Sequence, residues 1–136
     1  MTVHDPSSPV VDPAAACPCR SGCPFGECCA PLLSTAKDAS TALELMRSRY
    51  TAYALGDVAY LVRTWHPSTR PADLTLDAAT RWRSLHIVDT VAGGPDDQEG
   101  VVEFVARYRD DDGPGLLAER SRFRRDGGGW RYVDAM

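Results

Sequence analysis

The sequence predicts an α+β fold in which helices pack on a curved antiparallel sheet, preceded by a small cysteine-rich knuckle. Apolar residues recur every three or four positions between residues 41 and 66, and they alternate with polar residues after Trp82. Helices followed by an antiparallel meander are typical of α+β layer folds. All five cysteines lie between Cys17 and Cys29. We therefore expect a flexible tail over residues 1–16, a metal knuckle over 17–31 and an α+β domain over 32–136.

Two helices are expected at the start of the α+β domain. Thr41 followed by Glu44 matches a capping box, and Gly56 is a natural helix end. The apolar face of this first helix is formed by Leu43, Met46, Tyr50 and Tyr53. Asp57 can cap a second helix, which Pro67 would end.

Four strands are expected after the helices, at residues 82–91, 100–109, 116–125 and 130–134. In the third strand Glu119 alternates with Leu117 and Phe123, so the carboxylate is expected to face the concave side of the sheet. Glycine-rich segments between the strands indicate turns. The strand order is therefore that of a simple meander.

The composition argues against several functional classes. The net charge of −4 makes the protein a poor candidate for binding nucleic acid through a basic surface, although arginines cluster between Arg120 and Arg125. No apolar run is long enough to span a membrane, and the N-terminal residues do not resemble a signal peptide. We expect a cytoplasmic protein, in which clustered cysteines are more often metal ligands than disulfides.

The cysteine spacing predicts a metal site. The pair Cys17 and Cys19 is separated by eight residues from Cys28 and Cys29, with Cys23 between them. Two thiolate pairs on a short loop suit tetrahedral Zn²⁺, and a site of four cysteine thiolates with no open position is structural rather than catalytic. Disulfides, free thiols and an iron–sulfur cluster are the alternatives. The fifth cysteine leaves the ligand choice open, and we take Cys23 as the non-ligand.

Several separated segments resemble a known family. The knuckle is similar to the SEC-C motif, and four blocks resemble the bacterial YchJ family: LMRSRYTAY (45–53), GDVAYLVRTWHPS (56–68), ERSRF (119–123) and WRYVD (130–134). The resemblance implies zinc ligands at Cys17, Cys19, Cys28 and Cys29. It also implies a nuclear transport factor 2-like, or cystatin-like, cone that often encloses a pocket.

Two features depart from the family pattern. Arg20 stands where the motif usually has glycine, which affects the expected turn geometry. Some members also carry a second knuckle near the C-terminus, and the sequence up to Met136 contains none. A function that needs two knuckles is therefore not expected.

Five residues are candidates for lining a pocket in the cone: Tyr50, Tyr53, Trp65, His66 and Glu119. A carboxyl group or an imidazole in an apolar pocket can act as a base, with tyrosine as hydrogen-bond donor. The alternatives are that Glu119 pairs with an arginine (Arg47, Arg49 or Arg122), that His66 caps a helix end, and that the aromatic residues are core. No nucleophile–base pair or phosphate loop is visible, so we assign no catalytic residue and favour a protein that is not an enzyme.

The favoured function is a zinc-binding module. The knuckle would offer a rigid surface to a partner protein, and the cone would hold a small ligand or form a homodimer. The main alternative is an enzyme or a small-molecule carrier that uses the pocket near His66 and Glu119. A weaker alternative is contact with RNA through the knuckle and the arginines from Arg120 to Arg125.

Overall fold

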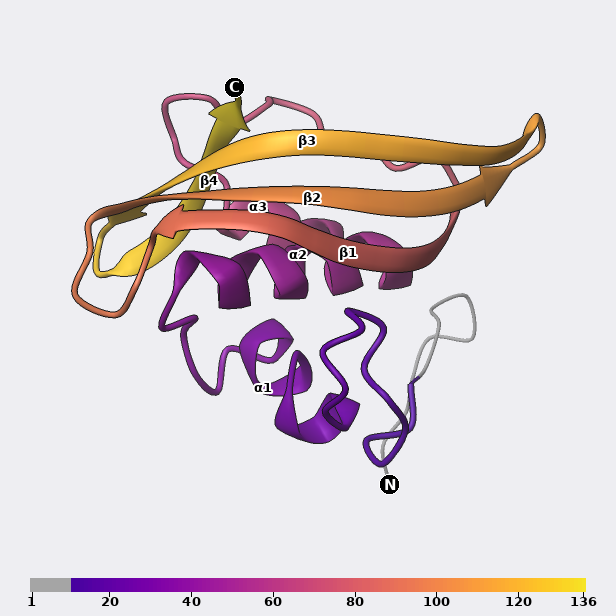
Figure 1. The fold of residues 1–136 in the computed structure, drawn as a ribbon, viewed down its shortest axis with the longest axis horizontal. Coiled ribbons are helices and arrows are strands. Elements are labelled where there is room, and N and C mark those ends of the chain that lie inside the picture. The colour runs from indigo at the N-terminus through magenta and orange to yellow at the C-terminus, as the bar shows by residue number, and fades with distance from the viewer. Residues whose placement is uncertain (1–10) are drawn as a thin grey trace.

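The computed structural model describes residues 11–136 (Figure 1). Residues 1–10, most of the expected tail, lie outside the described residues. The elements in chain order are η1 (Phe25–Glu27), α1 (Ala30–Leu33), α2 (Ala42–Leu55), α3 (Val58–Arg63), β1 (Arg81–Ala92), β2 (Glu99–Asp110), β3 (Gly113–Asp126) and β4 (Gly129–Ala135). The expected α+β fold with an N-terminal cysteine cluster is confirmed.

The four strands form one antiparallel sheet in the order β1-β2-β3-β4. Register shifts interrupt the β1–β2 ladder near Trp82 and Ile87, and another interrupts the β3–β4 ladder after Arg122. Such bulges bend and twist strands, which agrees with the curved ribbon in Figure 1. The β2–β3 hairpin is tighter than expected, because Asp110 already pairs with Gly113.

Local interactions fix both ends of α2. The Thr41 hydroxyl accepts a hydrogen bond from the Glu44 amide (3.1 Å), and the Glu44 carboxylate accepts one from the Ser40 amide (2.6 Å). Gly56 ends the helix with a φ of 74°, a left-handed conformation that glycine adopts without strain. Asp57 caps α3 by accepting from the Tyr60 amide (3.1 Å).

Helix α3 is shorter than expected, ending at Arg63. The chain then runs beside β4: the Tyr132 amide donates to the Thr64 carbonyl (2.8 Å), and the His66 amide donates to the Tyr132 carbonyl (2.7 Å). Trp65 and Tyr132 thus form a short parallel bridge. This pairing draws Trp65 toward the concave side of the sheet.

Helix α2 lies between the sheet on one side and the knuckle on the other (Figure 1). The helix is therefore buried on both of these sides. Its buried residues are Ala42, Leu45, Met46, Ser48, Arg49, Tyr50, Thr51 and Ala52. Cys17, Cys19 and Leu32 belong to the same core cluster as these apolar residues. No helix within residues 11–136 is both long and apolar enough to cross a membrane.

Candidate metal centre and ligand pocket

Four cysteine sulfurs converge beneath α2. The Sγ atoms of Cys17, Cys19, Cys28 and Cys29 all lie within 4.8 Å of one another. The Cys19–Cys28 separation is 3.6 Å and the Cys28–Cys29 separation is 4.0 Å. Four sulfurs at about 2.3 Å from a tetrahedral Zn²⁺ would be about 3.8 Å apart. No disulfide joins any of the five cysteines, so the structure does not contain the alternative disulfides.

The loop around the cysteines is held by backbone hydrogen bonds. The Cys17 amide donates to the Cys23 carbonyl (3.0 Å), and Ala16 bridges to Pro24. The Phe25 amide donates to the Ala15 carbonyl (2.8 Å), so the end of the expected tail is attached to the knuckle. Cys23 itself is exposed and stands outside the sulfur cluster.

Side chains on α2 and the knuckle loop contact the sulfurs. The Thr51 hydroxyl donates to Cys29 Sγ (3.3 Å) and lies 3.8 Å from Cys17 Sγ. Ser21 Oγ lies 3.1 Å from Cys28 Sγ. Donors placed on ligand sulfurs orient them and stabilise the thiolate form. Thr51 therefore belongs to the site, although the sequence pattern of cysteines does not reveal it.

The four sulfurs interact strongly, so the pKa values of neighbouring thiols move in opposite directions. Hydrogen bonds from Cys17 and Cys29 lower the pKa of Cys19, whereas burial raises the pKa of Cys28 to about 11. The hydrogen bonds to Cys17 and Cys19 raise the pKa of Cys29. Filling the site with a divalent cation would displace the thiol protons. Four soft sulfur donors at tetrahedral spacing fit a metal ion well, and they leave no open ligand position for catalysis.

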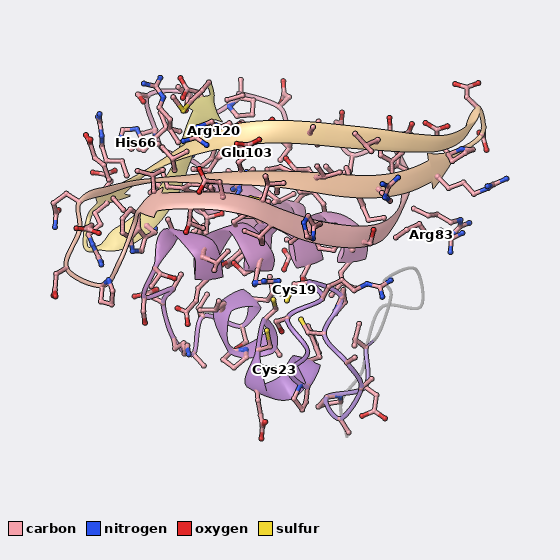
Figure 2. All side chains as sticks on the ribbon, in the orientation of Figure 1. Cys19, Cys23, His66, Arg83, Glu103 and Arg120 are labelled. Atoms are coloured by element: carbon pink, nitrogen blue, oxygen red, sulfur yellow. The ribbon has the colours of Figure 1, made fainter. Side chains whose placement is uncertain are left out.

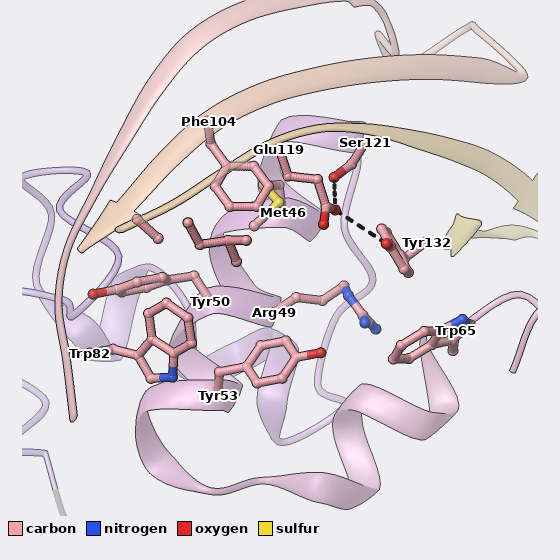
Figure 3. A pocket seen from close by; sticks show the side chains of 12 residues that line it. Met46, Arg49, Tyr50, Tyr53, Trp65, Trp82, Phe104, Glu119, Ser121 and Tyr132 are labelled. Carbon is pink, nitrogen blue, oxygen red and sulfur yellow. Dashed lines mark hydrogen bonds between the residues drawn. The ribbon is translucent and has the colours of Figure 1, made fainter. Parts of the chain in front are cut away.

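On the other side of α2, a pocket lies between the helix and the concave face of the sheet (Figure 3). Its volume is about 190 Å³. It is lined by Met46, Arg49, Tyr50, Tyr53, Trp65, Trp82, Phe104, Ala106, Leu117, Glu119, Ser121 and Tyr132. Burial raises the pKa of Tyr50 to about 12 and also raises the pKa of Tyr132, so both phenols are neutral donors at physiological pH.

The structure brings together four of the five expected pocket residues. Tyr50, Tyr53, Trp65 and Glu119 line the hollow, but His66 does not. The His66 imidazole instead lies 2.7 Å from the Ser68 hydroxyl and accepts from the Ser68 amide (3.1 Å). These contacts belong to the turn that follows Trp65, in which the Thr69 amide also donates to the His66 carbonyl (3.1 Å).

Glu119 points into the pocket and is held by neighbours on the sheet (Figure 3). Its Oε2 atom accepts hydrogen bonds from Ser121 Oγ (2.5 Å) and from the Tyr132 hydroxyl (3.2 Å). The three alternative ion pairs are not formed. Arg122 pairs with Asp134, and the other two arginines donate to carbonyl or hydroxyl oxygens: Arg47 to Cys19, and Arg49 to Leu61 and Thr64.

Arg49 is the most unusual residue in the pocket. Its side chain is only 3% exposed, and burial lowers the pKa of its guanidinium. Nη1 donates to the Leu61 carbonyl (2.8 Å) and to the Thr64 hydroxyl (2.7 Å). The guanidinium carbon lies 4.9 Å from the Trp65 ring centre and 4.8 Å from that of Tyr132. The cation is thus fixed between two aromatic rings.

The sequence prediction did not include eight of the pocket residues, among them Arg49, Trp82, Ser121 and Tyr132. Arg49 had a detectable signal, because it falls on the helical stripe of Met46, Tyr50 and Tyr53 at the i+3 position. An arginine inside an apolar stripe indicates a buried cation. Trp82 and Tyr132 lie on strands whose position relative to α2 depends on the bulges, which the sequence pattern does not locate.

Arginines on β3 form ion pairs with acidic side chains of the neighbouring strands. Arg120 pairs with Asp89 (3.1 Å) and Glu103 (2.9 Å), and Figure 2 shows Arg120 next to Glu103. Arg124 lies 3.4 Å from Glu99. Alternating opposite charges on adjacent strands leave little net positive charge for a nucleic-acid backbone.

Comparison with known proteins agrees with this architecture. Residues 41–135 match the family model described as the YchJ middle NTF2-like domain. A UPF0225 protein of Streptomyces avermitilis is 49% identical over 120 residues, which cover 88% of this chain and 83% of that protein. A UPF0225 protein of Streptomyces coelicolor is 47% identical, covering 90% of this chain and 95% of the relative.

Two solved structures share the fold together with the cysteine motif. A solution structure of a SEC-C motif protein from Rhodopseudomonas palustris has a TM-score of 0.77 and 33% identity, covering 90% of this chain and 98% of that chain. A crystal structure of a SEC-C motif protein from Psychrobacter arcticus has a TM-score of 0.74 and 25% identity, covering 90% and 82%. With an N-terminal cysteine knuckle and a matching cone, the chain belongs to the YchJ family of UPF0225 proteins.

Proposed function

We propose that this chain is a cytoplasmic zinc-binding protein in which the knuckle is structural and the cone receives a small ligand. The observation that carries the metal assignment is the convergence of four thiol sulfurs within 4.8 Å. Three of the four cysteines are buried, and reduced clustered thiols are typical of a cytosolic metal site. Zinc is favoured over an iron–sulfur cluster because sulfurs 3.6–4.0 Å apart match the edge of a tetrahedron around one ion.

The cone supports binding more than catalysis. Within the described residues, the pocket lining contains one carboxylate and one guanidinium, but no histidine, cysteine or lysine. Glu119 therefore has neither a histidine nor a second carboxylate in the lining with which to share proton transfer, and His66 lies outside the lining. A carrier or sensor of a small molecule fits this lining better than an enzyme. A partner protein at the knuckle and a homodimer stay predictions from the sequence.

The metal assignment is tested by native mass spectrometry with elemental analysis of protein from cells grown without added metal. We expect one Zn²⁺ per chain and no visible absorption from an iron–sulfur cluster. Cys28→Ser should lose the ion, and the matched control Cys23→Ser should keep it, because the exposed Cys23 stands outside the cluster. Less than half an equivalent of any metal in protein with reduced thiols contradicts the proposal.

A further inference from the structure

A buried positive charge faces the pocket without a negative partner. Arg49 has five N–H donors, of which Nη1 uses its two on Leu61 and Thr64. Within residues 11–136, the Tyr53 hydroxyl is a further polar neighbour of the guanidinium, but no carboxylate oxygen lies within 4.0 Å of it. Figure 3 shows the guanidinium directed into the hollow between Tyr53, Trp65 and Tyr132.

A structural role explains only part of this arrangement. Through Nη1, Arg49 binds the C-terminal carbonyl and cap of α3, and the two aromatic rings stabilise the cation further. These contacts leave one edge of the planar guanidinium without an anionic partner among the described residues. A buried charge usually has an oppositely charged partner, and a free guanidinium edge matches a carboxylate in a bidentate pair.

Glu119 does not supply that partner, although it lines the same pocket. Its Oε2 atom is turned to Ser121 and Tyr132, and within the described residues its Oε1 atom accepts no hydrogen bond. The pocket therefore presents a donor edge on α2 that lacks an anion and an acceptor oxygen on β3 that lacks a donor. A ligand that fills the space between them can satisfy both groups at once.

The walls of the pocket favour a flat apolar body. Six of the lining residues are aromatic: Tyr50, Tyr53, Trp65, Trp82, Phe104 and Tyr132. The hollow measures about 190 Å³. An apolar cavity of about 150 Å³ is large enough to hold benzene, so one aromatic ring with one or two polar groups fits here.

We propose that the cone binds a small aromatic carboxylate that also carries a hydroxyl or amino group. The carboxylate pairs with the edge of Arg49 that lacks an anion, the ring packs among the aromatic side chains, and the donor group binds Glu119. This inference rests on the proposed function, because it names the ligand class for the cone pocket. It does not depend on the metal in the knuckle, which lies on the other side of α2.

Binding can be measured on the unmodified zinc-loaded protein by NMR titration with benzoate, 3-hydroxybenzoate and 4-hydroxybenzoate. Benzamide is the matched neutral control, since it keeps the ring and the planar head group. The chain has three tryptophans, and only Trp65 and Trp82 line the pocket. Their indole N–H signals should move, whereas that of Trp130 should stay in place as an internal control.

We expect benzoate to bind at least about tenfold more tightly than benzamide, the usual scale for a hydrogen-bonded charge pair. At least one hydroxybenzoate isomer should bind more tightly than benzoate, and this gain should disappear in Glu119→Gln. Arg49→Gln should bind benzoate and benzamide equally. Leu117→Trp should narrow the pocket and so weaken the binding of every probe. Leu116→Trp is the control and should leave binding unchanged, because Leu116 is exposed and does not line the pocket.

The outcomes separate this inference from the function on which it rests. Equal binding of benzoate and benzamide to the unmodified protein overturns the pairing with Arg49, but it leaves the cone as a ligand pocket. The same holds if Arg49→Gln folds and keeps the preference for benzoate. Should no probe move the Trp65 and Trp82 signals at about 10 mM, both the ligand class and the proposed role of the cone in binding small aromatic molecules are wrong.

Discussion

The knuckle (residues 17–31) and the sheet of the cone are stabilised by different interactions. The knuckle contains one 3₁₀ turn and the start of α1, and its fully buried side chains are Cys17, Cys19 and Cys29. The sheet has four long strands and buries large apolar side chains such as Phe123 and Trp130. The knuckle has too little apolar surface to fold by burial alone, so its stability should depend on a metal, whereas that of the sheet should not.

Helix α2 connects these two regions. On one side, Thr51 contacts the cysteine sulfurs and Arg47 donates to the Cys19 carbonyl (2.9 Å). On the other side, Met46 and Tyr50 line the pocket under the sheet. The knuckle is thus stabilised by its own interactions, but it packs against α2 and is not a separate domain. Removal of the metal should therefore destabilise the side of α2 that faces the knuckle, but not the side that faces the sheet.

Metal removal is expected to have the largest effect. Binding of structural Zn²⁺ contributes on the order of 10 kcal/mol in zinc-finger peptides, and the knuckle has no comparable apolar core. Chelation should therefore abolish amide protection over residues 15–33, where the backbone hydrogen bonds hold the cysteine loop. Protection in β1–β4 should remain. Hydrogen exchange of metal-loaded and chelated protein measures both.

The knuckle and the sheet are not stabilised independently if chelation removes amide protection from the strands as well. In that case the four cysteines would support the whole core, which they share with Leu45 and Leu32. Partial loss confined to the knuckle side of α2, at Arg47 and Thr51, would instead agree with the contacts seen here.

A cavity in the sheet should give the opposite pattern. Phe123 is 1% exposed on β3, and truncation of a buried phenylalanine to alanine costs about 3–5 kcal/mol. Phe123→Ala should lower the urea midpoint of the cone strongly while the protein, below its unfolding transition, keeps one equivalent of zinc. Leu116→Ala is the matched control, since Leu116 on the same strand is exposed and should change stability little. Loss of zinc from folded Phe123→Ala would show that the regions are not independent.

Removal of the contact between α2 and the metal site should have an intermediate effect, which is seen in metal affinity. Thr51→Val keeps the shape of the side chain but removes the hydroxyl that donates to Cys29 Sγ. Loss of a hydrogen bond to a ligand typically lowers metal affinity about 10- to 100-fold. Competition with a chromophoric chelator measures this change. Thr51→Ser retains the hydroxyl and should bind metal nearly as well as the unmodified protein; equal affinity in Thr51→Val would exclude a role for this contact.

The strands and α2 were predictable because their signals are local. Period-two alternation located all four strands to within about three residues, and the capping residues Thr41 and Gly56 located α2. Helix α1 was missed, since four residues are too few for a periodic signal. The end of α3 was misplaced because pairing between Trp65 and β4 is a tertiary interaction.

The candidate sites were predictable where spacing alone defines geometry. The cluster was identified by two cysteine pairs with eight residues between them. Thr51, in contrast, is 22 residues from Cys29 and belongs to no sequence motif. His66 shows the reverse error: its place beside Trp65 favoured the pocket, and the turn after α3 directs the imidazole to Ser68 instead. Residues that meet through folding of distant segments need the structure.

The smallest expected effect concerns Arg20, which stands where the SEC-C motif usually has glycine. Its φ of 65° lies in the left-handed region, which costs a residue with a side chain about 1 kcal/mol or more. The guanidinium offsets part of this cost by donating to the Arg83 carbonyl on β1. The strain and the hydrogen bond thus act in opposite directions on knuckle stability.

Two substitutions separate these contributions. Arg20→Ala removes the hydrogen bond and keeps the strained backbone, whereas Arg20→Gly removes the hydrogen bond and relieves the strain. We expect the glycine variant to be more stable than the alanine variant by about 1 kcal/mol, since alanine at a positive φ is strained. Urea unfolding of both zinc-loaded variants measures the difference, and metal content controls for an intact site. If alanine is as stable as glycine, the left-handed turn at residue 20 is not a constraint, and the preference of the motif for glycine has another cause.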